Sequence, residues 1–441
     1  MRLRAFLALL ALLGTVLSSL PAAAITILRD AEMERALREL ARPIISAAGL
    51  SAGQVRIMVI QDDSLNAFVV DSSSVFIHSG LILKMKRPEM LQGVIAHEVA
   101  HIANGHLTRR AGNARAARNA ALFGMIASGL AAASDSRLGA AIGAGSIASA
   151  QGRFLSHTRG EESAADQSAV RYMTRAGIDP SALADVMEIF EGQEVLSAAR
   201  QDPYVRTHPL SRERLRAIRG YAAAYSDDSP PAPEAAYWYA RVQAKLTAHI
   251  RAPRYTLRKF KAKDTSDAAL VGRAYAYHRQ ANAPKALGEI GKLIARRPND
   301  AYAHELRGLI LMGARRFGDA AAAYRKAASL APKEPLIAAG HGAALLAAGR
   351  SAEALRVLEK ARARDRRNPR LLRDLAVAYA KQGQPAQASL ATAERYALTG
   401  RLETAGIHAR RAAGQLPRGS ASWQRAMDIA DAADRLAERK P

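Results

Sequence analysis

The chain has 441 residues, more than one hydrophobic core usually organises, so two or three domains are expected. It contains no cysteine, which excludes disulfide bonds and thiolate metal sites and leaves histidine and carboxylate side chains as metal ligands. The formal net charge of +24 suits anionic lipid, lipopolysaccharide or an acidic protein partner, or simply reflects solvated arginines. No nucleic-acid recognition motif accompanies this charge, so we expect no nucleic-acid partner.

Residues 1–24 have the three parts of a secretory signal peptide. Arg2 and Arg4 form a positive segment, an apolar run follows over 5–17, and small residues at 22–24 provide a cleavage site. The apolar run is shorter than the roughly 20 residues that a membrane-spanning helix needs. We therefore expect cleavage after this site and a mature protein that works outside the cytoplasm, in a bacterial periplasm.

The next part of the chain predicts an amphipathic helix and then a small sheet. The helix is expected over residues 25–48. Three short segments rich in β-branched residues follow at 55–60, 66–70 and 74–79, and turn residues separate them. Their lengths and boundaries predict a small antiparallel sheet. Helical patterns dominate from Pro88 onward, so the fold class expected for this domain is α+β and mostly helical.

Three histidines fall within the segment AHEVAHIANGH. His97 and His101 are four residues apart on a predicted helix, so their imidazoles share one face and can bind a single Zn²⁺. Glu98 stands beside them, where it can take a proton from a water molecule whose pKa the zinc lowers to about 7. The spacing therefore predicts two metal ligands and a general base. His106, just past the predicted helix end, is expected to cap the helix or to contact a ligand.

A catalytic zinc site needs a third protein ligand and one open position. Glu162 and Asp166 are four residues apart on a second predicted helix, so their carboxylates share a face. One carboxylate can bind the metal while the other accepts a hydrogen bond from the free N–H of a ligating imidazole. The sequence thus predicts one zinc ion per chain, held by two histidines and a carboxylate.

The segment 111–150 is rich in glycine and alanine, and a Ser-Asp-Ser turn divides it into two arms. Each arm is too short to span a bilayer. Close helix packing is one interpretation of this composition. A hairpin that touches the membrane, or one that covers the active site, is the other.

The C-terminal part contains an internal repeat, which follows a linker and connecting helix at 226–266. Small residues, a large residue at a fixed offset and prolines at the unit ends recur every 34 residues: Ala286, Ala320, Ala354 and Ala388; Ala274, Gly308, Gly342 and Ala376; Tyr277, Leu311, Leu345 and Tyr379; Pro298 and Pro332. This period is typical of tetratricopeptide repeats, whose helix pairs stack into an all-α solenoid with a concave groove. We therefore expect two domains, 25–225 and 267–437. The Arg-rich segment 360–373 favours an acidic protein partner in the second.

The two metal motifs resemble those of the HtpX-like and CAAX-prenyl-protease-like zinc metallopeptidases. The resemblance rests on HEVAH and on the downstream Glu162-x-x-x-Asp166. In that family the glutamate four residues before the aspartate is the third ligand, which implies Glu162 rather than Glu161. Thr158 stands where the family usually has serine. The resemblance does not extend to the membrane-spanning helices of the HtpX-like members, which this sequence lacks.

Other segments resemble the same family. Residues 66–68 and 78–82 resemble its substrate-edge strand, and 207–215 its late His-Pro segment. The resemblance implies peptide-bond hydrolysis, and an extended substrate is expected to add a strand to the edge formed by 74–79. Binding through the backbone in this way implies a loose sequence preference.

Together with the signal peptide and the repeats, the resemblance implies a periplasmic endopeptidase of the cell envelope. Its expected substrates are misfolded or stalled outer-membrane proteins, and it is expected to support outer-membrane β-barrel assembly. The repeats would contact the outer-membrane assembly machinery, and peripheral membrane contact is left open. The alternative is a repeat-based chaperone or scaffold whose peptidase domain is largely silent.

His208 has three alternative roles. It precedes Pro209, which stiffens the backbone there. It is a surface loop residue, a hydrogen-bond donor to the tetrahedral oxyanion, or a fourth zinc ligand that holds the resting enzyme off. The family resemblance favours the last role, a latch, and predicts that removing the side chain raises proteolysis.

Overall fold

The structure is a computed structural model. It describes residues 26–51, 53–106, 159–197, 200–209, 211–225 and 232–438. The expected signal peptide (1–24), the segment 111–150 and most of the linker after residue 225 lie outside the described residues. Below, the N-terminal half means the described residues from 26 to 225, and the repeat half means residues 267–438.

A small four-stranded sheet lies in the N-terminal half. Its strands are β1 (Ile27–Leu28), β2 (Arg56–Ile60), β3 (Ala67–Asp71) and β4 (Ser74–His78), in the spatial order β1-β2-β4-β3. β1 pairs with β2 and β3 pairs with β4 in antiparallel fashion, but β2 and β4 are parallel. The sheet is therefore mixed, and the antiparallel arrangement expected from the sequence is wrong. The tight β3–β4 turn, where Asp71 accepts hydrogen bonds from Ser73, lets the second strand of this hairpin insert beside β2.

The order of the strands also corrects the expected substrate edge. β4 lies between β2 and β3, and four of its five residues are buried, so it cannot accept another strand. The described sheet has two edge strands, the two-residue β1 and the five-residue β3, and β3 carries the exposed Val70. The edge available for β-strand addition is therefore β3 rather than the segment 74–79.

Helices make up most of the N-terminal half. They are α2 (Ala31–Ala47), α3 (Ser79–Lys84), α4 (Pro88–Ala103), a helix over 159–175, α7 (Ser181–Glu188), the short 3-10 helix η1 (Gln193–Val195), α8 (Pro203–Thr207) and α9 (Arg212–Ala223). The helix expected from residue 25 begins later because residues 27–28 belong to the sheet. Asp30 then caps α2 by accepting a hydrogen bond from the backbone N–H of Met33 at 2.9 Å.

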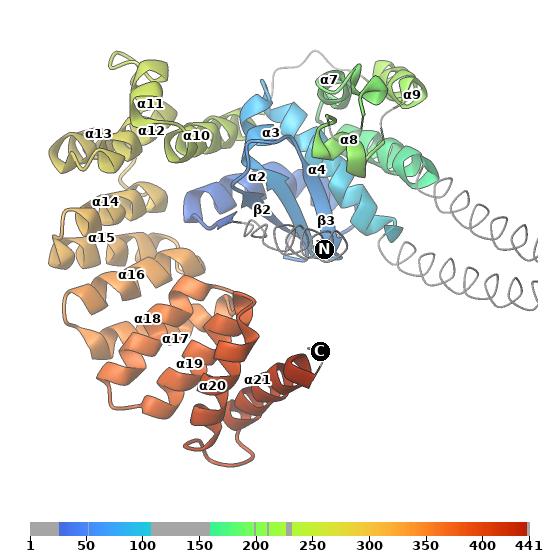
Figure 1. Ribbon diagram of the computed structural model, residues 1–441. Helices are drawn as coiled ribbons and strands as arrows, with labels where there is room; N and C mark the ends of the chain where they lie inside the picture. Colours follow the sequence, from blue (N-terminus) through green and yellow to red (C-terminus); the bar gives the residue numbers. More distant parts are fainter. Residues whose placement is uncertain are drawn as a thin grey trace, which may run out of the picture.

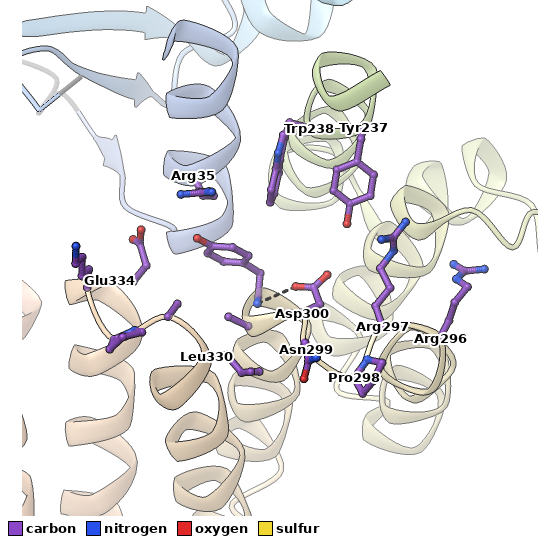
Figure 2. Close-up of a pocket in the computed structure, with 15 residues that line it drawn as sticks. Arg35, Tyr237, Trp238, Arg296, Arg297, Pro298, Asn299, Asp300, Leu330 and Glu334 are labelled. Atoms are coloured by element: carbon purple, nitrogen blue, oxygen red, sulfur yellow. Dashed lines mark hydrogen bonds between the residues drawn. The ribbon is translucent and has the colours of Figure 1, made fainter. Parts of the chain in front are cut away.

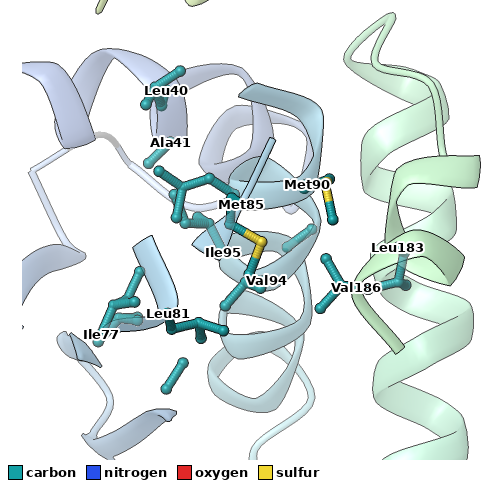
Figure 3. Packing of buried hydrophobic residues seen from close by; sticks show 14 of the residues in the cluster. Leu40, Ala41, Ile77, Leu81, Met85, Met90, Val94, Ile95, Leu183 and Val186 are labelled. Carbon is teal, nitrogen blue, oxygen red and sulfur yellow. The ribbon is translucent and has the colours of Figure 1, made fainter. Parts of the chain in front are cut away.

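Helix α4 runs through the core of this half, and all but its last two residues are buried. In Figure 3 its apolar side chains lie between Leu81 and Ile77 on one side and Leu183 and Val186 of α7 on the other. Gly93 lies at the contact with α7, where a Cβ would be in van der Waals contact with the Cα of Leu183 at 3.4 Å. The helix that carries His97 and His101 is therefore held rigidly on several sides.

The repeat half is an all-helical solenoid, as the sequence predicts (Figure 1). Its helices are α12 (Asp267–Arg279), α13 (Ala283–Arg296), α14 (Ala301–Gly313), α15 (Phe317–Leu330), α16 (Pro335–Ala347), α17 (Ser351–Arg364), α18 (Pro369–Lys381), α19 (Pro385–Leu398), α20 (Leu402–Ala413) and α21 (Ala421–Glu438). The first helices of four successive pairs begin at residues 267, 301, 335 and 369, in the predicted register. The recurrent small residues lie where paired helices touch: a Cβ at Gly308 would lie 2.6 Å from the ring of Tyr324.

Helix α10 (Pro233–Ile250), followed by α11 (Pro253–Lys259), joins the two halves (Figure 1). α10 packs on α2 of the N-terminal half and on α12 of the repeats. Its fully buried Arg241 pairs with Glu32 of α2 and with Asp300, which precedes α14. The connecting helix is thus integrated into both halves. In the described part of the chain, no helix is long and apolar enough to cross a membrane.

Candidate metal centre

Four buried side chains from three separate elements converge in the N-terminal half. They are His97 and His101 of α4, Glu162 of the helix at 159–175, and His208 immediately after α8. One ligand atom from each lies within 4.8 Å of the other three. Among the described residues this is the one such group of histidine and acidic side chains that could hold a metal ion. Three of the four are the zinc ligands that the sequence predicts.

The distances within the group fit a tetrahedral metal ion. The Nε2 atoms of His97 and His101 are 3.1 Å apart, and the Glu162 carboxylate oxygens lie 3.3 Å and 3.5 Å from these two nitrogens. Ligand atoms about 2.0–2.1 Å from a tetrahedral Zn²⁺ lie about 3.3 Å from one another. Two nitrogen donors and a carboxylate donor at these separations therefore fit a Zn²⁺ ion without rearrangement.

The charge states of the metal-free group are also suited to metal binding. Burial, together with the neighbouring His97, holds the pKa of His101 well below its usual value, so that its imidazole is neutral. Burial opposes ionisation of Glu162, but His208 and His97 outweigh it and hold its pKa well below the usual value. Burial likewise opposes protonation of His97, but hydrogen bonds to Asp166 and Glu162 prevail and raise its pKa to about 10. A metal ion must therefore displace one proton from His97.

The predicted partner of a ligating imidazole lies where the helical spacing suggests. The Asp166 carboxylate is 3.0 Å from Nδ1 of His97, on the side of the ring away from the donor group. Arg214 of α9 binds the same carboxylate with two hydrogen bonds, of 2.8 Å and 2.9 Å. Burial raises the pKa of Asp166, but the bonds from His97 and Arg214 outweigh this effect and keep the carboxylate ionised. Asp166 thus fixes the His97 ring with Nε2 directed at the group.

His106 has the same relation to the second imidazole. Its Nδ1 lies 2.9 Å from Nδ1 of His101, and its side chain is buried. Gly105 has a φ of 68°, a left-handed conformation that turns the chain back at the end of α4 and brings His106 under that helix. Of the two roles expected for His106, the structure therefore favours contact with a ligand over capping.

Glu98 lies beside the group, as the HEVAH spacing predicts. Its side chain is fully buried, and its Oε1 is 3.4 Å from Nε2 of His208. It is not one of the four converging side chains. This position is suitable for a base that handles a proton next to the metal, whereas Glu161, the neighbour of Glu162, is outside the group.

His208 is held from two sides. Its ring stacks on Tyr204 with centroids 4.6 Å apart, and Tyr204 in turn stacks on Phe190 at 4.9 Å. The Thr207 hydroxyl is 2.9 Å from Nδ1 of His208, which leaves Nε2 to face Glu98. The structure therefore makes His208 a buried residue rather than an exposed loop residue, and places it against the donor group.

The short helix that carries His208 is attached to the start of the edge strand. The Tyr204 N–H donates to the carbonyl oxygen of Leu65 at 3.1 Å, and the Thr207 hydroxyl lies 3.4 Å from Oδ1 of Asn66. β3 begins at the next residue, Ala67. These two hydrogen bonds thus connect the start of β3 to the short helix that precedes His208.

Sequence reasoning missed Arg214, Tyr204, Thr207 and Phe190 as parts of the site. Arg214 lies in RERL, which looks like a solvated helix start, and the aromatic residues have no recognisable spacing. One signal was available for Arg214, because the predicted pair Glu162 and Asp166 needs a buried cation to balance its second negative charge.

Comparison with known proteins identifies the domains. Residues 28–222 match the family model of peptidase family M48. The chain contains an M48 metallopeptidase domain. Residues 345–394 match a tetratricopeptide-repeat model, which confirms the predicted combination of the two domains.

Curated relatives match this chain over different shares of its length. The "Beta-barrel assembly-enhancing protease" of Escherichia coli strain K12 is 24% identical over 386 residues, 86% of this chain and 78% of the relative. Its namesake from Yersinia pestis is 25% identical over 358 residues, 79% of this chain and 72% of the relative. The "Mitochondrial metalloendopeptidase OMA1" of Schizosaccharomyces pombe is 32% identical over 178 residues, 40% of this chain and 49% of the relative.

Proposed function

We propose that this M48 metallopeptidase is a periplasmic, zinc-dependent endopeptidase that degrades misfolded or stalled outer-membrane proteins and supports β-barrel assembly. The observation that carries the proposal is the convergence of His97, His101 and Glu162, with Glu98 beside them. The names of the relatives support the link to β-barrel assembly. The periplasmic location rests on the signal peptide expected at residues 1–24.

In this proposal His97, His101 and Glu162 hold one Zn²⁺, and Asp166 and His106 fix the two imidazole rings. The metal supplies Lewis acidity toward the scissile carbonyl and lowers the pKa of the attacking water. Glu98 takes a proton from that water and delivers it to the leaving amine. Because Glu98 is fully buried beside the donor group, it can carry this proton without exchange with bulk solvent.

The substrate strand pairs with the outer side of β3, the longer of the two edge strands of the described sheet. Pairing of this kind uses backbone N–H and C=O groups, so it selects extended, unfolded chains more strongly than particular sequences. Such loose selectivity is suited to the removal of proteins that fail to fold. Selection among clients would come from the repeats, which dock partner proteins and the outer-membrane assembly machinery.

His208 acts as a latch in the resting enzyme. Its ligand atom lies with those of the metal group, so it can fill the position that water would otherwise occupy. The links from Thr207 to Asn66 and from Tyr204 to Leu65 connect the latch to the strand edge, where the substrate enters. A chain that pairs with β3 would shift this attachment and release His208. Donation from His208 to the oxyanion is the competing role.

The proposal is tested with the purified full chain, casein and an unfolded outer-membrane barrel protein. Cleavage should stop on addition of a chelator and return when Zn²⁺, but not Mg²⁺, is restored, because nitrogen donors prefer zinc to magnesium. Persistent cleavage in chelator would refute zinc dependence. Binding of the unfolded barrel protein with no cleavage in any metal condition would favour the scaffold alternative.

A further inference from the structure

A cavity of about 820 Å³ lies at the junction of the two halves, away from the metal centre (Figure 2). Helices α2 and α10 form one side, and the loops that precede α14 and α16, at 297–300 and 331–334, form the other. These two loops occupy equivalent positions in successive repeats. No residue of the cavity wall belongs to the metal group, so this is a separate site.

Aromatic rings form one wall of the cavity. Trp238 of α10 meets Tyr302 of α14 edge to face, with centroids 6.0 Å apart, and Tyr237 stands beside Trp238. Tyr302 is mostly buried, whereas Trp238 and Tyr237 are half-buried and line the open space. This wall offers an apolar surface that can receive an aromatic or aliphatic side chain.

Arginines lie over these rings. The guanidinium of Arg35 is 5.8 Å from the centroid of Trp238, and that of Arg297 is 5.0 Å from the centroid of Tyr237. Stacking on a ring restricts each guanidinium plane, and each group also pairs with a carboxylate, Arg35 with Glu39 and Arg297 with Asp267. Fixed guanidinium groups of this kind are the donors that carboxylates bind most specifically.

The cavity has an excess of positive charge. Arg296 and Arg297 share the single carboxylate of Asp267, and the exposed Lys333 has no ion-pair partner among the described residues. Arg35 pairs with Glu39, which Arg42 also contacts; Arg42 has a second partner in Glu234, so Arg35 adds no unpaired charge.

The two acidic residues of the wall have partners outside it. Glu334 is held by Arg38, and Asp300 is held by the buried Arg241, which it shares with Glu32. The positive excess at the mouth of the cavity therefore comes from Lys333 and from the pair Arg296 and Arg297.

We propose that this cavity docks an acidic peptide segment of a partner protein. Carboxylates of the segment meet Arg35, Arg297 and Lys333, and an aromatic or aliphatic side chain packs on Trp238. Since the wall combines residues from both halves, the docked segment holds the partner next to the M48 domain. The inference rests on the proposed docking role of the repeats, but it does not depend on the metal centre.

The chain offers a built-in reporter for this site. It contains two tryptophans, Trp238 in the cavity wall and Trp423 in α21, so Trp423→Phe leaves Trp238 as the only tryptophan. The experiment titrates the full chain carrying Trp423→Phe and Glu98→Gln with a short peptide of aspartate, glutamate and one phenylalanine. Glu98→Gln prevents cleavage of the peptide. The matched probe is the same peptide with lysine in place of each acidic residue.

The acidic peptide should produce a saturable change in Trp238 fluorescence, and the lysine peptide should not. Lys333→Glu should weaken binding about tenfold, because it replaces an attractive charge by a repulsive one. Lys333 is exposed and unpaired, so this variant should fold normally. Lys326→Glu, an equally exposed lysine outside the cavity, should leave the affinity unchanged. Added salt should weaken binding.

Three results would overturn the proposal. They are equal binding of the lysine peptide, an unchanged affinity in Lys333→Glu, and a fluorescence change with vesicles of anionic phospholipid but none with the acidic peptide. The last result would assign the surface to the membrane. If the acidic peptide still binds to Lys333→Glu but no longer binds to Arg362→Glu, a change in α17 outside the cavity, this cavity is refuted while the docking role of the repeats stands. The titrated chain carries Glu98→Gln, so the outcome does not depend on proteolysis.

Discussion

The metal centre and the junction between the two halves both bury several carboxylates. The two regions differ in what balances the negative charge of these carboxylates. At the junction the ammonium of Lys245 lies among three carboxylates, 2.9 Å from Asp30, 3.1 Å from Glu32 and 3.4 Å from Glu305. A side chain of the protein occupies the place where a cation would bind. In the metal group the nitrogen and oxygen donors converge on one another. The nearby Arg214 binds Asp166 and also lies 3.3 Å from Oε2 of Glu162.

This difference shows that buried acidic residues do not by themselves mark a functional site. A cluster of carboxylates around a lysine of the chain itself already has its cation, and its role is to join elements of the fold. A cluster whose donors face one another within 4.8 Å can still take up a proton or a metal ion. Each prediction below alters one of the two clusters and leaves the other as its internal reference.

The largest effect is expected from Glu98→Gln. The substitution removes the base without removing a metal ligand, so we expect proteolysis to fall about 10²–10⁴-fold. The zinc content and the unfolding temperature should stay at the values of the unaltered chain. Cleavage of casein at a comparable rate would show that another group activates the water.

At the junction, Lys245→Met should destabilise the protein by about 3–5 kcal/mol, because it leaves three carboxylates around an uncompensated centre. Urea unfolding followed by circular dichroism measures this loss. Lys326→Met, an exposed lysine of α15, is the matched control and should change stability by less than about 0.5 kcal/mol. If both variants were equally stable, the central role of Lys245 would be wrong.

The junction should also respond to pH. Burial raises the pKa of Glu305 to about 7 in the folded chain, although Lys245 opposes this shift. A carboxyl group whose pKa is raised by folding contributes stability at low pH and loses it as the pH rises through the folded value. The free energy of unfolding should therefore decrease by about 2–3 kcal/mol between pH 5 and pH 8. Glu305→Gln should flatten this part of the curve, and an identical slope in the variant would exclude Glu305 as its source.

The smallest effect is expected at the latch. His208→Ala should raise the cleavage of an unfolded substrate several-fold, about 1 kcal/mol in the barrier, because the metal position is then open to water. Thr207→Val, which removes the hydrogen-bonding hydroxyl beside Nδ1, should change the rate in the same direction but less. A clean drop in the rate of His208→Ala at unchanged zinc content would assign His208 to the oxyanion instead.

The sequence predicts those features that depend on spacing along one element. The histidine pair and the Glu162/Asp166 pair each lie on one helix face, and the repeat period reappears in the first residues of successive helices. The resemblance to HtpX-like metallopeptidases and the repeat architecture are confirmed by the matches to peptidase family M48 and to the tetratricopeptide repeat. The choice of ligands remains a prediction.

Features that depend on distant segments could not be predicted in this way. The position of β4 at the centre of the sheet depends on how the β3–β4 hairpin inserts beside β2. The residue pattern of a five-residue strand does not show which strand will be its neighbour. The attachment of α8 to Leu65 and the burial of Lys245 are likewise tertiary effects. In the sequence, Lys245 and Arg214 look like ordinary cations on solvated helix faces.

The central claim is that His97, His101 and Glu162 bind one zinc ion, and elemental analysis of the full chain purified without chelator tests it most directly. The account predicts about one equivalent of zinc per chain. It also predicts loss of most of that zinc in His101→Ala and in Glu162→Ala, and full retention in Glu161→Ala. Full zinc occupancy in Glu162→Ala together with loss of zinc in Glu161→Ala would contradict the account.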